Sequence, residues 1–222
     1  DPRQLNEAAE KLKLSKQPII IAGGGILYSE AEKELSDFAK KHNIPVTPTV
    51  MGIGCMTKDD PYYIGAIGCL GEGSSNSLSK DTDLALAIGT KLGDFTTGSW
   101  SNFQNEDFKL VSINTARFDV TKHLATPVIS DAKIGLLELS KALGDWRAPN
   151  NWYERSIDER KKWDSYVEKQ SGPTNQELPS YAHAVGAVYR NADPSDIVVT
   201  AAGGLVGEVV QIWKPKELNT FE

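Results

Sequence analysis

The segment IIIAGGGILYSEAEKELSDFAKK, residues 19–41, carries the clearest indication of the fold. Together with the preceding proline, its first residues form a short apolar run, 18–22, that ends at glycine. Such a run is typical of a strand that is buried on both faces. Beyond the glycines, Ala31, Leu35 and Phe38 recur at helical spacing and define one apolar stripe. The stretch therefore predicts the strand–loop–helix half of a βαβ unit.

The glycine triplet, Gly23, Gly24 and Gly25, leaves two interpretations open. The dinucleotide fingerprint G-x-G-x-x-G is filled at its first two glycines, but Tyr28 stands at the third. The next apolar segment, residues 44–50, also ends without the acidic residue that such a site uses. Because the loop has no Cβ atoms, it lets a flat ligand or another backbone approach closely. The triplet is therefore either part of a cofactor cradle or a tight turn.

Acidic residues argue against phosphate binding in two glycine-containing loops. Ser29 and Glu32 predict a capping box that starts the helix at Ser29. Glu30 and Glu32 then place negative charge where a diphosphate would sit. The later run GEGSSN, which begins at Gly71, resembles an anion nest, but Glu72 opposes a phosphate. We expect a plain loop there.

Bulk properties exclude several classes of protein. With 222 residues, 40% of them hydrophobic and 24% charged, the chain is long enough for one large domain or one domain and part of another. A net charge of −6 without a basic run argues against nucleic-acid or anionic-membrane partners. Cys55 and Cys69 give no disulfide framework, and no apolar run reaches the roughly 20 residues of a membrane span. We expect a cytoplasmic protein, and both ends suggest a piece excised from a longer one.

Buried-strand patterns recur along the first part of the chain, and helical or turn-rich stretches separate them. This alternation predicts a doubly wound parallel sheet of the α/β class. The right-handed crossover rule then brings the loops after the strands to one edge, where ligands bind in such sheets. The predicted strands are residues 18–22, 44–50, 63–67, 84–89, 109–113 and 127–130, and a helix is predicted at 131–142.

Residues with catalytic or metal-binding patterns are not evident. No G-x-S-x-G elbow and no phosphate-binding G-x-x-x-x-G-K-[ST] motif occurs. His42, His123 and His183 are scattered without metal spacing, which favours surface or helix-packing roles. Lys91 and Asp94 follow the fourth predicted strand, where they either bind polar ligand groups or are solvated. We therefore expect a ligand-binding edge with no catalytic residue and no metal ligand.

The sequence pattern changes after residue 145. Residues 146–179 contain a charged helix and a linker rich in turn-forming residues. Residues 180–222 then predict a helix, a strand that runs into glycines over 196–204, and a further helix. This order is that of the opening βα unit of a following α/β domain. The chain therefore divides into 1–145, 146–179 and 180–222.

The order of several motifs resembles one enzyme family. The motifs are PIIIAGGG at 18–25, YYIGAIGCLGEGSSNSLSKDT at 62–82, DLALAIGTKLGDFTT at 83–97, VSINTARFD at 111–119 and SDIVVTAAGG at 195–204. They are similar to the Rossmann-like middle domain of thiamine-diphosphate enzymes of the acetolactate synthase type, followed by the start of the pyrophosphate-binding domain. The resemblance covers essentially the whole chain. Within the family it points to the branch that opens a trihydroxycyclohexane-1,2-dione in myo-inositol catabolism.

The resemblance implies a thiamine-diphosphate and Mg²⁺-dependent hydrolase that cleaves a C–C bond of a cyclic polyol-dione to give 5-deoxyglucuronate. The cofactor sits between chains in this family, so a homodimer or homotetramer is implied. The activating glutamate and the metal motif fall outside residues 1–222, so the piece alone is expected to be inactive. Alternatives are a carboligase or decarboxylase of the acetolactate synthase kind, or a non-catalytic nucleotide-binding module of the related sirtuin-type fold. Cys55 and Cys69 do not suffice for the four-cysteine zinc site of sirtuins.

The resemblance also assigns two groups of cofactor-side residues. Some relatives hold FAD or ADP at the edge of the middle domain, in a groove that here would be flanked by Gly23, Gly24, Gly25, Gly89, Thr90, Lys91 and Asn114. Asn114 stands where flavin-binding relatives carry an acid, so we expect that FAD is not retained and that no cofactor is tightly bound to the piece. Gly203, Gly204 and Leu205 match the loop beside the diphosphate, which they would contact through backbone N–H groups.

Overall fold

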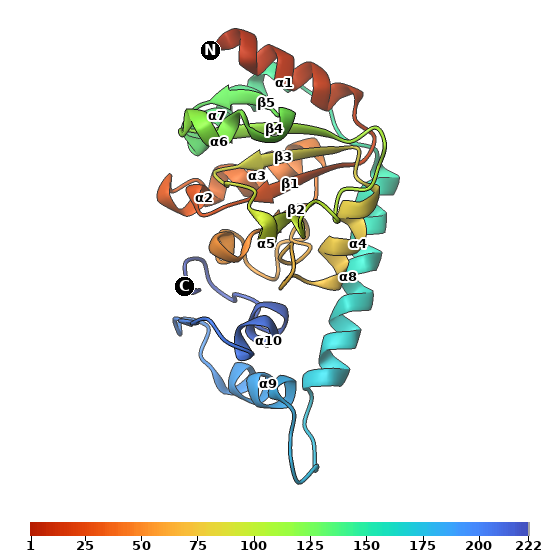
Figure 1. Cartoon of the computed structure of the whole chain (residues 1–222), viewed down its shortest axis with the longest axis vertical. Coiled ribbons are helices and arrows are strands. Elements are labelled where there is room, and N and C mark those ends of the chain that lie inside the picture. The colour runs from red at the N-terminus through yellow and green to blue at the C-terminus, as the bar shows by residue number, and fades with distance from the viewer. Residues whose placement is uncertain (222) are drawn as a thin grey trace.

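A computed structural model of the chain describes residues 1–221 and contains one five-stranded sheet in which every strand is parallel to its neighbours. The strand order is β2-β1-β3-β4-β5, so the chain winds outward in both directions from β1 and β3 (Figure 1). The strands are β1 (Pro18–Ala22), β2 (Val46–Pro48), β3 (Leu84–Ile88), β4 (Lys109–Asn114) and β5 (Thr126–Ile129). The predicted doubly wound α/β fold is confirmed.

Ten α-helices and two short 3₁₀ turns accompany the strands within residues 1–221. The first seven helices are α1 (Pro2–Leu14), α2 (Gly25–Tyr28), α3 (Glu32–His42), α4 (Gly73–Asp81), α5 (Asp94–Thr97), α6 (Arg117–Val120) and α7 (Ala132–Leu143). The last three are α8 (Asn150–Ser171), α9 (Tyr181–Asn191) and α10 (Leu205–Ile212). The 3₁₀ turns are η1 (Val50–Gly52) and η2 (Lys122–Leu124). No helix in this part of the chain combines the length and apolarity needed to cross a membrane.

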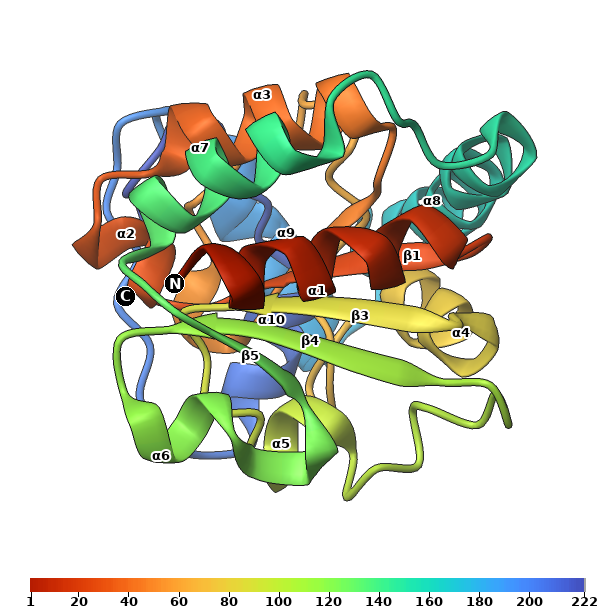
Figure 2. The ribbon, with the colours of Figure 1, turned by 90° about the horizontal axis from the view of Figure 1, so that it is seen from above.

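Both faces of the sheet are covered, because successive side chains of a strand point to opposite faces. Ile20 and Leu86 belong to a core cluster with α1, α3 and α7, whereas Ile21 and Ala87 belong to a second cluster with α4 and the start of α8. Figure 2 shows α1, α3 and α7 on one side of the sheet and α4 and α5 on the other. Fully burying an isoleucine contributes about 1.5–3 kcal/mol, so the all-apolar strands supply much of the stability.

The segment 63–67 is buried as predicted but is not a strand. Its contact with the sheet is limited to an isolated parallel bridge between Tyr63 and Val46 and to the N–H groups of Ile64 and Ile67, which donate to carbonyls of β2. Side chains satisfy the backbone of Ala66 instead: Glu72 Oε1 accepts its N–H at 3.1 Å, and Ser75 Oγ donates to its carbonyl at 2.5 Å. These local bonds compete with a strand ladder, so the strand prediction was wrong here.

The predicted capping box at Ser29 is also wrong. Helix α3 begins at Glu32, and its N-cap residue, Ala31, makes no side-chain cap bond. Ser29 Oγ donates instead to Asp131 Oδ2 at 2.6 Å, and Asp131 in turn caps α7. A hydrogen bond to a carboxylate is stronger than one from a neutral backbone amide, which explains the choice. The one-turn helix α2 therefore fills the space between the glycines and α3.

After α7, helix α8 runs along one side of the first domain, and the residues that follow it form a small separate layer with α9 and α10 (Figure 1). Trp152, near the start of α8, is buried and donates from Nε1 to the Pro18 carbonyl at 2.8 Å, which clamps α8 against β1. The strand predicted within 196–204 is reduced to one parallel bridge between Val198 and Phe221. A strand needs a partner along its length, and residues 1–221 offer it only this short one.

A third apolar cluster attaches this last layer to the first domain. Ile53 and Ala66 from the first domain pack with Val210, Trp213 and Phe221. In Figure 1 the last layer, with α9 and α10, lies beyond the β2 edge of the sheet, beside the lower half of α8. This last layer, residues 180–221, is called the C-terminal unit below. Apolar packing, as well as the covalent link through α8, holds it to the first domain.

Candidate functional site

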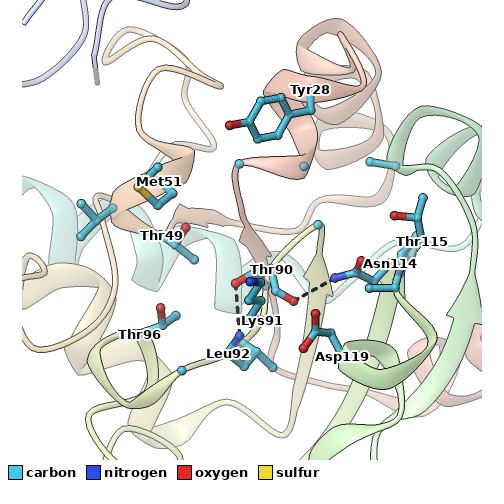
Figure 3. A pocket seen from close by; sticks show the side chains of 18 of the residues that line it. Tyr28, Thr49, Met51, Thr90, Lys91, Leu92, Thr96, Asn114, Thr115 and Asp119 are labelled. Carbon is cyan, nitrogen blue, oxygen red and sulfur yellow. Dashed lines mark hydrogen bonds between the residues drawn. The ribbon is translucent and has the colours of Figure 1, made fainter. Parts of the chain in front are cut away.

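A cleft of about 630 Å³ opens at the carboxyl edge of the sheet, among the loops that follow β1, β3 and β4 (Figure 3). Its volume lies in the range of small-molecule sites, and its position is the one where open α/β sheets bind ligands. Of the seven residues expected at this edge, six line the cleft: Gly24, Gly25, Gly89, Thr90, Lys91 and Asn114. Gly23 lies beneath it, against the loop after β3.

The glycine triplet makes a backbone-to-backbone contact. A Cβ atom on Gly23 would lie 2.3 Å from the Gly89 carbonyl oxygen, and one on Gly25 would lie 2.5 Å from the Gly89 Cα. The Gly25 N–H also donates to the Gly89 carbonyl at 3.0 Å. The loops after β1 and β3 therefore approach each other as only glycines allow. Gly24 differs, because it lines the cleft and meets only Met51 and the Tyr28 ring.

Asn114 ties together the loops after β3 and β4. Its Nδ2 donates to the Thr90 carbonyl at 3.1 Å (Figure 3), and its Oδ1 accepts the Ala116 N–H at 3.0 Å. An acidic side chain at this position would aim a carboxylate oxygen at the Thr90 carbonyl, which also carries negative charge. The side-chain amide of Asn114 is thus engaged in hydrogen bonds within the chain. Flavin-binding relatives are expected to carry an acidic residue at this position.

Charge in the cleft is sparse. The lining has two charged side chains, Lys91 and Asp119, and Asp119 pairs with Lys122 at 2.6 Å. Lys91 is exposed and makes no ion pair with any described residue. Asp94, which follows Lys91 in the sequence, lies outside the lining, while the Tyr28 ring is 89% exposed at the rim. The cleft therefore offers one cation, backbone polar groups and apolar surface, which suit binding more than acid–base chemistry.

The histidines take no part in the cleft. His42 is buried on α3, with Nδ1 2.7 Å from the Trp146 carbonyl oxygen and Nε2 3.0 Å from Ser140 Oγ, and burial lowers its pKa. This is the helix-packing role that the sequence favoured. His123 is exposed, and His183 completes a capping box at the start of α9. Across residues 1–221, no three histidine, cysteine, aspartate or glutamate side chains are grouped so that they could hold a metal ion.

The second group of expected residues, 203–205, lies outside the cleft, at the start of α10. Gly203 has a φ of 150°, and a Cβ on Gly203 or Gly204 would meet no atom within 4 Å. No side chain caps this helix end, so its first N–H groups stay accessible. Leu205 is 47% exposed and lines a separate apolar groove. The ten expected residues therefore form two distinct regions.

Sequence reasoning missed a buried ion pair. Glu72 was expected in a plain loop, yet its side chain is fully buried, and Oε1 accepts hydrogen bonds from the Tyr63 hydroxyl at 3.2 Å and from a backbone N–H. Its Oε2 lies 3.5 Å from Nζ of Lys214, in the C-terminal unit. Burial raises the pKa of Glu72. No local pattern marks this pair, because its members lie far apart in the chain.

The parallel sheet with a cleft at its carboxyl edge defines a Rossmann-like α/β domain. The sequence model of the family described as "Thiamine pyrophosphate enzyme, central domain" matches residues 5–139, and the chain belongs to this family. The family predicted from the motifs is thereby confirmed.

Several relatives that align with nearly the whole of this chain carry the same name. The 3D-(3,5/4)-trihydroxycyclohexane-1,2-dione hydrolase of Bacillus anthracis (strain CDC 684 / NRRL 3495) is 32% identical over 241 aligned residues. The protein of the same name from Clostridium tetani (strain Massachusetts / E88) is 33% identical over 242. In both cases the alignment covers 98% of this chain but 37% of the relative. The chain thus spans little more than a third of the length of these curated relatives.

Proposed function

We propose that the chain is part of a longer thiamine-diphosphate-dependent enzyme that hydrolyses a C–C bond of 3D-(3,5/4)-trihydroxycyclohexane-1,2-dione to give 5-deoxyglucuronate. The observation that carries this proposal is the 31–33% identity to hydrolases of that name along 98% of the chain. The likeness therefore extends past the family match, which ends at residue 139, into the C-terminal unit. The substrate would be a small cyclic polyol-dione.

The domain division follows the same reasoning. Residues 1–145 would be the central domain, 146–179 a connecting helix and linker, and 180–222 the start of the pyrophosphate-binding domain. The parallel bridge between Val198 and Phe221 encloses α10, which supports the opening of a βαβ unit. An apolar groove of about 920 Å³ lies between α9, α10 and the bridge, and further strands of that domain would cover it.

The start of α10 fits the diphosphate of the cofactor. Gly203 and Gly204 have open space around them, and the uncapped helix end presents N–H groups and the positive end of the helix dipole. Glu208, in the first turn of α10, is acidic and would repel the diphosphate. Mg²⁺ would therefore need to accompany the diphosphate and offset its charge. When bound, thiamine diphosphate supplies the carbanion chemistry, and this part of the chain would orient it. We assign no catalytic residue or metal ligand to residues 1–222.

Turnover by the full-length protein tests the proposal. The protein would be incubated with thiamine diphosphate, Mg²⁺ and the cyclic dione, and the products followed by NMR, with pyruvate in a parallel reaction. We expect ring opening to 5-deoxyglucuronate and no product from pyruvate, with the 222-residue chain alone as an inactive control. Formation of acetolactate without consumption of the dione would support the carboligase alternative. Sedimentation of the same preparation tests the proposed homodimer or homotetramer.

The cleft favours a second candidate function, weak binding of an adenine nucleotide such as ADP. Lys91 supplies one positive charge beside an apolar floor and backbone groups. An exposed lysine contributes about 1 kcal/mol at most, so retention of a large cofactor such as FAD through purification is not expected. Titration of the chain with ADP, with Lys91→Ala as the control variant, tests this. Equal binding by both proteins would place the nucleotide elsewhere.

A further inference from the structure

A partly buried cluster of charges joins three parts of the chain. Glu72 stands at the start of α4 in the first domain, Asp164 lies on α8, and Lys214 follows α10. The ammonium group of Lys214 pairs with the Asp164 carboxylate and lies 3.5 Å from Glu72 Oε2. Arg160 on α8 also pairs with Asp164, at 3.2 Å. Both Glu72 and Lys214 are buried, so water screens their interaction only weakly.

Stability alone does not explain this cluster. The groups that face Glu72 are Lys214 and Arg160, which favour its charge, and Tyr63 and Asp164. Burial still outweighs them and raises the pKa of Glu72. Among the described atoms, Glu72 Oε2 has no hydrogen-bond partner. A well-packed apolar pair is often at least as stable as such an ion pair, whereas a buried ion pair is best attested as a device that fixes one arrangement.

The arrangement that the cluster would fix is that of α10. Lys214 stands two residues after the last residue of this helix, and Gly203 and Gly204 come directly before its first residue. Next to Lys214, the Pro215 carbonyl accepts the N–H of Lys58 at 2.9 Å, a second contact with the first domain. Because a short helix moves as a rigid rod, fixing its C-terminal end also sets the direction in which its N-terminal end points.

We propose that Lys214 is a positioning residue: held between Glu72 and Asp164, it orients α10 so that residues 203–205 meet the cofactor diphosphate. This rests on the proposed function for the role of residues 203–205. Lys214 would itself touch neither cofactor nor substrate. Its effect on binding would pass through the helix.

Four variants of the full-length protein test the proposal. Lys214→Met breaks the pair, and the double variant Glu72→Gln, Lys214→Met replaces both charges together. Lys216→Met is the matched control, because the Lys216 ammonium contacts the Ala192 carbonyl and the Tyr189 ring, both within the C-terminal unit. For each protein, one measures the melting temperature without cofactor and the Kd for thiamine diphosphate in Mg²⁺.

The two readouts should separate in the double variant. We expect Lys214→Met to lower the melting temperature and to weaken cofactor binding about tenfold or more, a factor that corresponds to 1.4 kcal/mol. The double variant should regain the wild-type melting temperature but keep the weakened binding, while Lys216→Met keeps wild-type affinity. Recovery of both properties in the double variant would mean that the pair is merely structural and would overturn the proposal. Lys214→Arg, which keeps the charge, should bind the cofactor more tightly than Lys214→Met, and equal weakness of the two would also contradict it.

A second measurement separates this inference from the proposed function. If the wild-type full-length protein bound no thiamine diphosphate, the proposed function would fail, and the role of Lys214 would be read from hydrogen exchange in the 222-residue chain. We expect the amides of α10 to exchange faster in the double variant than in the wild type, with those of α3 unchanged. Unchanged exchange in α10 would refute the orienting role independently of any cofactor.

Discussion

Replacing Gly23 by alanine should separate the packing role of the glycine triplet from a ligand-binding role. The new Cβ atom would lie 2.3 Å from the Gly89 carbonyl oxygen, 2.8 Å from its carbonyl carbon and 2.6 Å from Thr90 Cβ. Two of these three atoms belong to the backbone after β3, the central strand between β1 and β4. The contact cannot be relieved by rotating one side chain, so the loop or the strand has to move.

The expected loss of unfolding free energy is the difference between two opposing effects. Overpacking in a well-packed region costs about 1–3 kcal/mol. Replacing glycine by alanine returns about 0.4–1 kcal/mol by restricting the unfolded chain. We therefore expect Gly23→Ala to lose about 1–2 kcal/mol of unfolding free energy. For a chain of this length, each kcal/mol lowers the melting temperature by about 2–4 °C.

Urea and thermal unfolding of the 222-residue chain, without ligand, give the comparison. Gly93→Ala is the matched control, because Gly93 also lines the cleft but an added Cβ there meets nothing within 4 Å. We expect the control to remain within about 1 kcal/mol of wild type, since the unfolded-chain gain and the loss at the start of α5 are both small. A Gly23→Ala chain as stable as wild type, or as Gly93→Ala, would refute the backbone-contact argument.

Four further outcomes are expected. Asn114→Asp should lower the unfolding free energy by about 1–3 kcal/mol at neutral pH, because a carboxylate then faces the Thr90 carbonyl; an unchanged urea midpoint would contradict this. Burial lowers the pKa of His42, so the unfolded chain binds the proton first, and stability should fall as pH drops below about 6.5; midpoints measured at two pH values should show this slope flattened in His42→Gln. Limited proteolysis should cut first within 171–179, and first cuts within 20–140 would sink the proposed division. The purified chain should be colourless, and stoichiometric FAD released on denaturation would show that the cleft holds a flavin.

The parts of the fold that local sequence could predict are those with a strong periodic signal. The strands read as continuous apolar runs because helices cover both sheet faces, and glycines mark where β1 and β3 end. The handedness of the crossovers then placed Gly89, Lys91 and Asn114 at one edge, where the structure has the cleft. These inferences needed no knowledge of distant partners.

The features that sequence could not predict depend on partners far along the chain. Ser29 has the pattern of a helix cap, but Asp131 offers its hydroxyl a stronger acceptor. Glu72 has the pattern of an exposed loop acid, but Tyr63 and Lys214 meet it in the interior. Even the exact use of the glycine triplet depended on Gly89, which only the folded chain brings into contact.

If thiamine diphosphate binds at the start of α10 and not in the cleft, the two regions would serve two different ligands. Hydrogen exchange of the full-length protein, with and without thiamine diphosphate and Mg²⁺, distinguishes between the two regions. We expect slower exchange over 203–207 on adding the cofactor, with residues 23–25 and 89–91 unchanged. Slower exchange at 23–25 and 89–91, with none at 203–207, would contradict it.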